Sequence, residues 1–151
     1  MIHYRNEMRR SGVDRRALVS TARRLLATVG EADAALSLAL VKDETIRALN
    51  KRFRGRDAAT DVLSFPLDDL PGPLERERLL GDVVISVETA RRQASAYDAP
   101  LQRELYRLLI HGLLHLKGHD HEAPAERRRM QREERRLADA IALPWPYGET
   151  G

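Results

Sequence analysis

The sequence predicts a single α+β domain with a small mixed sheet of about four strands, about five helices and one strongly apolar helix at its centre. Short apolar runs with alternating or β-branched residues are typical of strands. Longer segments with apolar residues at helical spacing are typical of helices that pack on a core. A length of 151 residues suits one compact domain. We therefore expect residues 1–151 to form one domain.

The first half of the chain shows both patterns. Residues 13–29 place apolar side chains on one side of a helix and paired arginines on the other, and Gly30 follows as a helix-ending glycine. Residues 35–41, ALSLALV, alternate leucines in the period of a strand. Asp43 then precedes a second predicted helix as a candidate N-cap, and this helix is expected to end near Gly55.

Two further strands are expected at residues 60–67 and 81–88, because both runs are rich in β-branched or aromatic residues. The segment between them, DDLPGPLERERLL, contains Pro-Gly-Pro, which prevents regular structure at its centre. We expect the two runs to lie side by side as a hairpin-like pair.

The rest of the chain is predicted to be helical. A helix is expected at residues 88–97, and Pro100 marks the start of a longer one at 101–118. Leucines cover most of the surface of this longer helix, so it belongs at the centre of the domain. Pro124 opens a last helix before the proline-rich tail PWPY.

Composition excludes several classes of protein and site. The chain has no cysteine, so a soft-metal site must be built from imidazoles and carboxylates. It has no run of the roughly 18 apolar residues that a membrane span needs. The N-terminal segment MIHYRNEMRR also lacks the apolar stretch of a signal peptide. We expect a cytoplasmic monomer that does not associate with membranes.

The basic residues are almost all arginines. Lys+Arg number 26 against 23 Asp+Glu, and lysine occurs at only three positions. Arginine suits bidentate contact with phosphate, but exposed arginines usually belong to solvated helix faces. Local clustering is therefore the better indicator of a binding site. The densest basic cluster near a predicted strand consists of Lys51, Arg52, Arg54 and Arg56.

Four of the five histidines lie within HGLLHLKGHDH, residues 111–121. His111 and His115 are one helical turn apart and share a face. Gly118 can end the helix in a left-handed conformation and return His121 to the same ion. Three imidazoles around Zn²⁺ leave a fourth position for water or substrate, which is typical of catalytic zinc. We predict that these three histidines bind one zinc ion per chain.

The same spacing occurs in the metzincin peptidase motif HExxHxxGxxH, but Gly112 replaces the glutamate that acts as general base. A peptidase is therefore disfavoured. The missing side chain leaves room either for another group beside the metal or for close helix packing. We expect His119 to point away from the metal, with a role as ligand or proton shuttle as the alternative. We expect Asp120 to orient a ligand imidazole.

Several blocks of this sequence resemble one family. HGLLHLKGHDH is similar to HGxLHLxGYDH, LNKRFRGRDAATDVLSFPL (49–67) to LNxxYRxKDxPTDVLSFP, and GDVVIS (81–86) to GDIxIS, all of the YbeY family of bacterial metal-dependent endoribonucleases. The tail PWPY is similar to the Pro-Tyr ending common there. The resemblance covers about residues 35–147 and is weak before that. His119 and Ala59 depart from the family's Tyr and Pro, at positions that supply no metal ligand.

This resemblance implies a zinc-dependent, single-strand-specific endoribonuclease. The resemblance also implies that the protein acts in ribosomal RNA maturation, at the 3′ end of small-subunit rRNA, and in ribosome quality control. Its expected partners are proteins of the small subunit. The resemblance also implies that His111, His115 and His121 bind the zinc and that Arg54 contributes to activity. The other three basic residues of the cluster would hold RNA phosphate beside the zinc, with a merely solvated loop as the alternative.

Two other functions stay open at this point. One is a ribosome-assembly or RNA-binding factor in which the zinc is structural. The other is a peptidase-like or small-molecule hydrolase, which a carboxylate near the metal from elsewhere in the chain would favour. Ser64 has no visible base partner and is rejected as a nucleophile. For an endoribonuclease, either water or the 2′-hydroxyl of the RNA can be the nucleophile. Asn50, Thr60 and Asp61 are expected to hold the loop around them in place.

Overall fold

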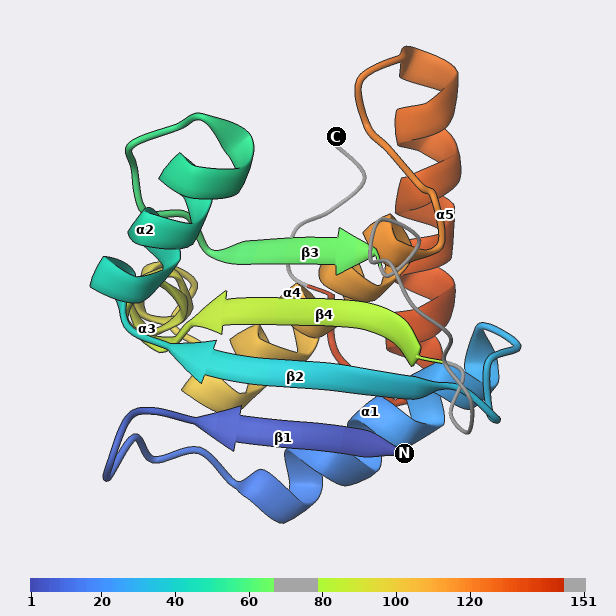
Figure 1. Ribbon diagram of the computed structural model, residues 1–151. Helices are drawn as coiled ribbons and strands as arrows, with labels where there is room; N and C mark the ends of the chain where they lie inside the picture. Colours follow the sequence, from blue (N-terminus) through green and yellow to red (C-terminus); the bar gives the residue numbers. More distant parts are fainter. Residues whose placement is uncertain (67–78, 146–151) are drawn as a thin grey trace.

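The computed structural model describes residues 1–66 and 79–145. In Figure 1 they form a four-stranded sheet flanked by helices. The predicted α+β fold, with a mixed sheet and five helices, is confirmed. The elements follow in the order β1 (Ile2–Asn6), α1 (Arg15–Thr28), β2 (Ala35–Val41), α2 (Asp43–Arg54), β3 (Val62–Pro66), β4 (Leu79–Ser86), α3 (Val87–Ala96), α4 (Leu101–Leu116) and α5 (Pro124–Ala140).

The strand order in the sheet is β1-β2-β4-β3. β1 and β4 both pair with β2 in parallel, whereas β3 pairs with β4 in antiparallel orientation, with Ser64 opposite Val83. The expected pairing of the third and fourth strands is therefore confirmed. This arrangement leaves β3 at one edge of the sheet, next to the end of α4.

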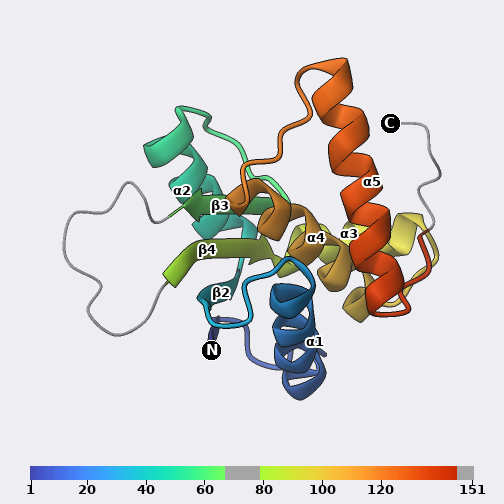
Figure 2. The ribbon, with the colours of Figure 1, turned by 90° about the vertical axis from the view of Figure 1, so that its right-hand side faces the viewer.

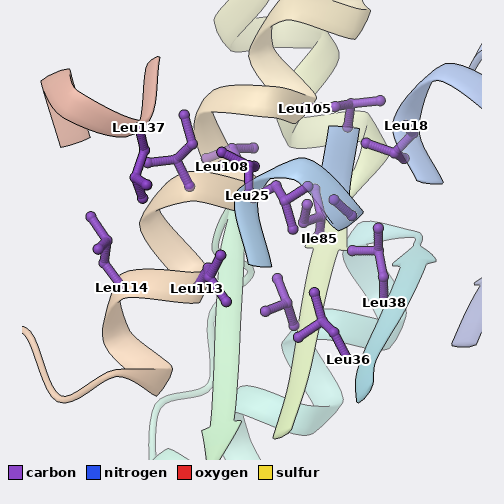
Figure 3. Close-up of a cluster of buried hydrophobic side chains, with 14 of the residues drawn as sticks. Leu18, Leu25, Leu36, Leu38, Ile85, Leu105, Leu108, Leu113, Leu114 and Leu137 are labelled. Carbon is purple, nitrogen blue, oxygen red and sulfur yellow. The ribbon is translucent and has the colours of Figure 1, made fainter. Parts of the chain in front are cut away.

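The two faces of the sheet pack against different helices. Along β2, Leu36, Leu38 and Leu40 are fully buried toward α1 and α4, because alternate side chains of a strand point to the same face. Figure 3 shows Leu36 and Leu38 with Ile85 of β4 among leucines of the helices. Ile46 of α2 packs on the opposite face, and in Figure 2 α2 lies across the sheet from α1, α4 and α5.

Helix α4 is the centre of the fold, as its sequence predicts. It contacts β3, β4, α1, α3 and α5. Leu105, Leu108, Leu109 and Leu113 are fully buried, and burial of each such side chain stabilises the fold by about 1.5–3 kcal/mol. The helix ends where Gly118 adopts a φ of 89°. The residues that follow are thereby turned back toward the side of α4 that is less deeply buried.

Two elements differ from the sequence-based expectations. Residues 2–6 form β1, which we did not predict, because only pairing with β2 makes this short and polar segment a strand. The strand expected at 81–88 runs instead from Leu79 to Ser86. It stops there because the Ser86 hydroxyl accepts a hydrogen bond from the Thr89 N–H and caps α3.

Asp43 is not the N-cap that its position indicated. Lys42 occupies the N-cap of α2 and makes no side-chain cap, while Asp43 is the first residue of the helix. Its carboxylate accepts hydrogen bonds from the hydroxyls of Ser86 and Thr89 instead. The residue thus ties the starts of α2 and α3 together.

The predicted Pro-Gly-Pro segment at 71–73 and the tyrosine of the tail at 147 lie outside the described residues. Within the described ranges, no helix combines the length and the hydropathy that crossing a bilayer requires.

Candidate metal centre

The structure brings His111, His115 and His121 together. One ligand nitrogen from each ring lies within 4.8 Å of the other two. The Nε2 atoms of His111 and His115 are 3.1 Å apart, and His121 returns to them after the turn at Gly118. Its ring centroid is 5.7 Å from that of His111 and 5.5 Å from that of His115. Helix geometry and one glycine turn therefore assemble three imidazoles from eleven consecutive residues.

The donor set fits a divalent metal ion of the zinc type. Zn–N bonds of about 2.0–2.1 Å in a tetrahedral site place the ligand nitrogens about 3.3–3.4 Å apart. The 3.1 Å separation in the His111–His115 pair is close to this value. The remaining separations between the ligand nitrogens are at most 4.8 Å, and His121 is the exposed member of the three.

The surroundings keep His115 in the form that binds metal. Burial lowers the pKa of this imidazole, and the neighbouring His111 and His121 lower it further, whereas a backbone hydrogen bond at His119 and the charge of Asp120 act in the opposite direction. A lowered pKa keeps the ring neutral at neutral pH. The lone pair on its nitrogen is then available to a metal without prior loss of a proton.

A carboxylate that we did not predict lies beside His111. The Oε2 atom of Glu134, on α5, is 3.7 Å from Nδ1 of His111, and its side chain is only 13% exposed. A sequence signal for it exists, because Glu134 lies on the same face of α5 as the buried Met130 and Leu137. An acidic residue on the buried face of a helix usually has a partner.

His119 and Asp120 play smaller parts than the three ligands. His119 lines the same cleft but does not belong to the converging group. The carboxylate of Asp120 accepts a hydrogen bond from the backbone N–H of His121, at 2.7 Å. It therefore holds the backbone of a candidate ligand in place, whereas the sequence had suggested that it orients a ring.

Gly112 is required by packing. A Cβ atom at this position would lie 2.8 Å from Cγ1 of Val83 and 3.2 Å from Cγ2 of Val62. The hydroxyl of Ser64 donates a hydrogen bond to the Gly112 carbonyl. Of the two explanations for the missing side chain, close packing of α4 on β3 and β4 is therefore the one that holds. A glutamate at this position has no room.

The histidines open onto a cleft of about 660 Å³ that also contains Arg54. Arg54 is the last residue of α2, which ends at Gly55 with a φ of 71°. Its guanidinium donates a 2.6 Å hydrogen bond to the Ser64 carbonyl and lies 5.2 Å from the centroid of the Phe65 ring. The arginine that the sequence singled out is thus anchored at the wall of the histidine cleft.

The other basic residues of the predicted cluster lie elsewhere. Lys51, Arg52 and Arg56 are exposed and are not among the described residues that line this cleft. The guanidinium of Arg52 lies 5.1 Å from the centroid of the Phe53 ring. An RNA-binding role for these three residues stays a prediction.

The loop before β3 is held by polar contacts, as expected. The buried Asn50 side chain donates to the Ala58 carbonyl. Asp61 lines the cleft, but its carboxylate already accepts hydrogen bonds from the Val62 N–H and from Gln93. Asp61 thus serves as a structural acceptor.

Comparison with protein families places this geometry in a known context. The family described as Endoribonuclease YbeY matches residues 3–142. The match therefore begins well before residue 35, where the resemblance in the sequence became clear.

Individual relatives carry the same name. An Endoribonuclease YbeY of Anaeromyxobacter sp. is 55% identical over 85% of this chain and 65% of its own length. One of Myxococcus xanthus is 51% identical over 81% of this chain and 42% of its own length. The chain thus spans less than two thirds of these relatives. A solution structure of a Thermotoga maritima protein, 27% identical, matches with a TM-score of 0.62 over 93% of this chain and 89% of that protein.

Proposed function

Since the chain belongs to the YbeY family, we propose that it is a metal-dependent endoribonuclease that cleaves single-stranded RNA. One observation carries this proposal. A single cleft contains three converging imidazoles, which can hold a metal ion, and an anchored arginine, which can stabilise charge on a phosphate.

Each group has a distinct part in the reaction. The three histidines hold the metal, which when bound supplies Lewis-acid chemistry and activation of water. The guanidinium of Arg54 binds the scissile phosphate through paired N–H donors and stabilises the charge that develops on it. Its contacts with Ser64 and Phe65 hold the guanidinium in position before substrate arrives. The Arg54 side chain therefore loses little conformational freedom during the reaction.

The finer features of the proposal concern the metal and the substrate. The metal is one zinc ion per chain, because three imidazoles without a thiolate suit zinc. The substrate is ribosomal RNA at the 3′ end of the small-subunit rRNA, and the protein also acts in ribosome quality control. It works in the cytoplasm as a monomer of one domain, together with proteins of the small subunit. Lys51, Arg52 and Arg56 add sequence-independent attraction for RNA phosphate.

The decisive experiment combines metal analysis with cleavage of a defined single-stranded RNA. We expect Arg54→Glu to fold and to bind one metal ion per chain, because Arg54 is exposed and is not a ligand. We expect its cleavage rate to fall by about 100-fold or more. Arg16→Glu is the matched control, since it makes the same charge change on an exposed arginine of α1 and should cleave normally.

The alternative of an RNA-binding factor with a structural zinc predicts other results. In that case Arg54→Glu lowers only RNA affinity, and loss of a histidine unfolds the protein. Wild-type cleavage rates in Arg54→Glu, or absence of bound metal in protein purified without chelator, would overturn the proposal. A 2′,3′-cyclic phosphate on the product would identify the RNA 2′-hydroxyl as the nucleophile.

A further inference from the structure

A second hollow lies on the other side of Arg54. It is a groove of about 710 Å³ over the sheet face opposite α4. Arg54 and Pro66 line both the groove and the histidine cleft, so the two hollows adjoin. A chain that passes Arg54 on its way out of the cleft therefore enters the groove.

The floor of the groove is formed by side chains in register across the sheet. His3, Ser37, Asp82 and Phe65 are successive cross-strand neighbours on β1, β2, β4 and β3. Arg5 belongs to the next row on the same face. The groove thus runs from the edge strand β1 to the wall formed by α2.

Both phenylalanines of the chain meet at the α2 end of this groove. Phe53 and Phe65 lie edge to face with their ring centroids 5.5 Å apart. Phe53 is 54% exposed, which is unusual for such a large apolar side chain. Arg52 and Arg54 stack over the two rings. Exposed aromatic rings interleaved with arginines are the surface on which single-stranded nucleic acids stack their bases.

We propose that this groove binds the nucleotides of single-stranded RNA next to the cleavage site, with one base stacked on Phe53. Arg54 connects the two hollows, and Arg5 adds a positive charge on the floor, where Asp82 is the one acidic residue among the described residues that line the groove. RNA rather than a protein is the favoured occupant, because the groove continues the cleft in which the phosphate is cleaved. This inference rests on the proposed nuclease function, because the cleavage site determines which nucleotides of the RNA would lie in the groove.

The test measures binding of a 2′-O-methylated single-stranded oligonucleotide that resists cleavage and carries one 2-aminopurine. Stacking on an aromatic ring quenches the fluorescence of this base. We expect quenching by the wild-type protein, and for Phe53→Ala an affinity lower by on the order of tenfold with the quenching lost. Phe53→Trp should retain both. Tyr97→Ala is the matched control, because Tyr97 is an exposed aromatic residue (49%) that lines neither hollow.

The same preparations are assayed for cleavage of unmodified RNA, with KM and kcat measured separately. We expect Phe53→Ala to raise KM and to leave kcat and metal content unchanged. Wild-type affinity and quenching in Phe53→Ala, or equal losses in Tyr97→Ala, would overturn the groove and leave the nuclease proposal intact. If the wild type does not cleave RNA but Phe53-dependent binding persists, the nuclease proposal fails and the groove stands.

An independent observation concerns Glu134. Since Nε2 of His111 faces His115, its Nδ1 is the nitrogen on the Glu134 side, 3.7 Å from Oε2. We infer that Glu134 is a positioning residue, whose negative charge favours the tautomer of His111 with its proton on Nδ1 and thereby leaves the Nε2 lone pair for the metal. Carboxylates behind a ligand imidazole have this effect in other metal sites, where their loss typically lowers metal affinity by 10- to 100-fold.

Zinc affinity by chelator competition and the visible absorption spectrum of the cobalt-substituted protein test this inference. We expect Glu134→Ala to weaken zinc binding by about 10- to 100-fold and to alter the cobalt spectrum. Glu134→Gln, which retains a hydrogen-bond acceptor, should recover part of the affinity. The control is Glu133→Ala, whose carboxylate pairs with Arg136 and not with a histidine. Unchanged affinity and spectrum in Glu134→Ala, or a loss confined to metal-free stability, would overturn the inference.

Discussion

The cluster around Asp43 and the group of three histidines use their polar atoms in opposite ways. The Asp43 carboxylate accepts hydrogen bonds from Ser86, Thr89 and Arg92, and its backbone N–H donates to Glu88. Donors and acceptors are matched within that cluster.

The histidines instead direct like groups at one another. Nitrogens of three imidazoles converge, and burial together with the neighbouring rings lowers the pKa of His115. A structural polar cluster and a ligand-binding cluster thus differ within the same fold. Matched hydrogen bonds stabilise the protein by themselves, whereas converging lone pairs become favourable when they share a cation.

The largest effect is expected for His115→Ala, which removes one of the three converging imidazoles. We expect the variant to lose zinc affinity by at least about 100-fold and to lose cleavage, because two imidazoles remain of three. Its thermal unfolding without metal should stay close to that of the metal-free wild type. Equilibrium dialysis and circular dichroism measure the two quantities. An unfolded His115→Ala protein would assign the histidines to structure, as the rival function requires.

The next largest effect is expected on acidification, which should disrupt the group of three histidines at a higher pH than the Asp43 cluster. Protonation of an imidazole removes the lone pair that binds metal, and the lowered pKa of His115 keeps this ring neutral to a lower pH than an ordinary histidine, whose pKa is about 6.5. We therefore expect zinc to be released only below that pH. Zinc release is followed with a chelating dye, and unfolding by circular dichroism in the same titration.

The Asp43 cluster should resist acid for longer. Burial alone would raise the pKa of Asp43, but hydrogen bonds from Ser86, Thr89 and Arg92 together hold it below its usual value. Its contribution to stability is therefore complete above about pH 4 and is lost as the pH falls through the lowered pKa. Simultaneous zinc release and unfolding would contradict the separation of the two clusters.

A smaller effect is expected for Asp43→Ala. The fully buried Ser86 hydroxyl would lose its acceptor, and an unpaired buried donor costs about 1–3 kcal/mol. Denaturant unfolding should show a loss of this size with unchanged zinc affinity. Asp139→Ala makes the same chemical change on an exposed residue of α5 and should alter the unfolding free energy by less than about 0.5 kcal/mol. Equal losses of unfolding free energy in the two variants would contradict a specific contribution of the Asp43 cluster to stability.

Arg92→Ala should have the smallest effect. Its side chain is 64% exposed, and exposed ion pairs contribute at most about 1 kcal/mol. We expect a change in unfolding free energy below this value that shrinks further in high salt. A loss as large as that of Asp43→Ala would mean that the arginine, rather than the two hydroxyls, holds the cluster together.

The sequence by itself determined the parts of the molecule that depend on local patterns. The spacing of His111 and His115 follows from the helical repeat, and Gly118 supplies the turn that returns His121. The apolar surface of α4 likewise predicted its central place. These features are recoverable because each is encoded within a few turns of one segment.

Only the tertiary structure decided the contacts between distant segments. Glu134 meets His111 across two helices, and Phe53 meets Phe65 across a helix and a strand. Asp43 does not cap α2 but accepts hydrogen bonds from hydroxyls at the end of β4 and in the first turn of α3. Such contacts depend on how α2, α4 and α5 pack against the sheet. Residue periodicity reports which face of an element is apolar, but it does not report which residue of another element that face will meet.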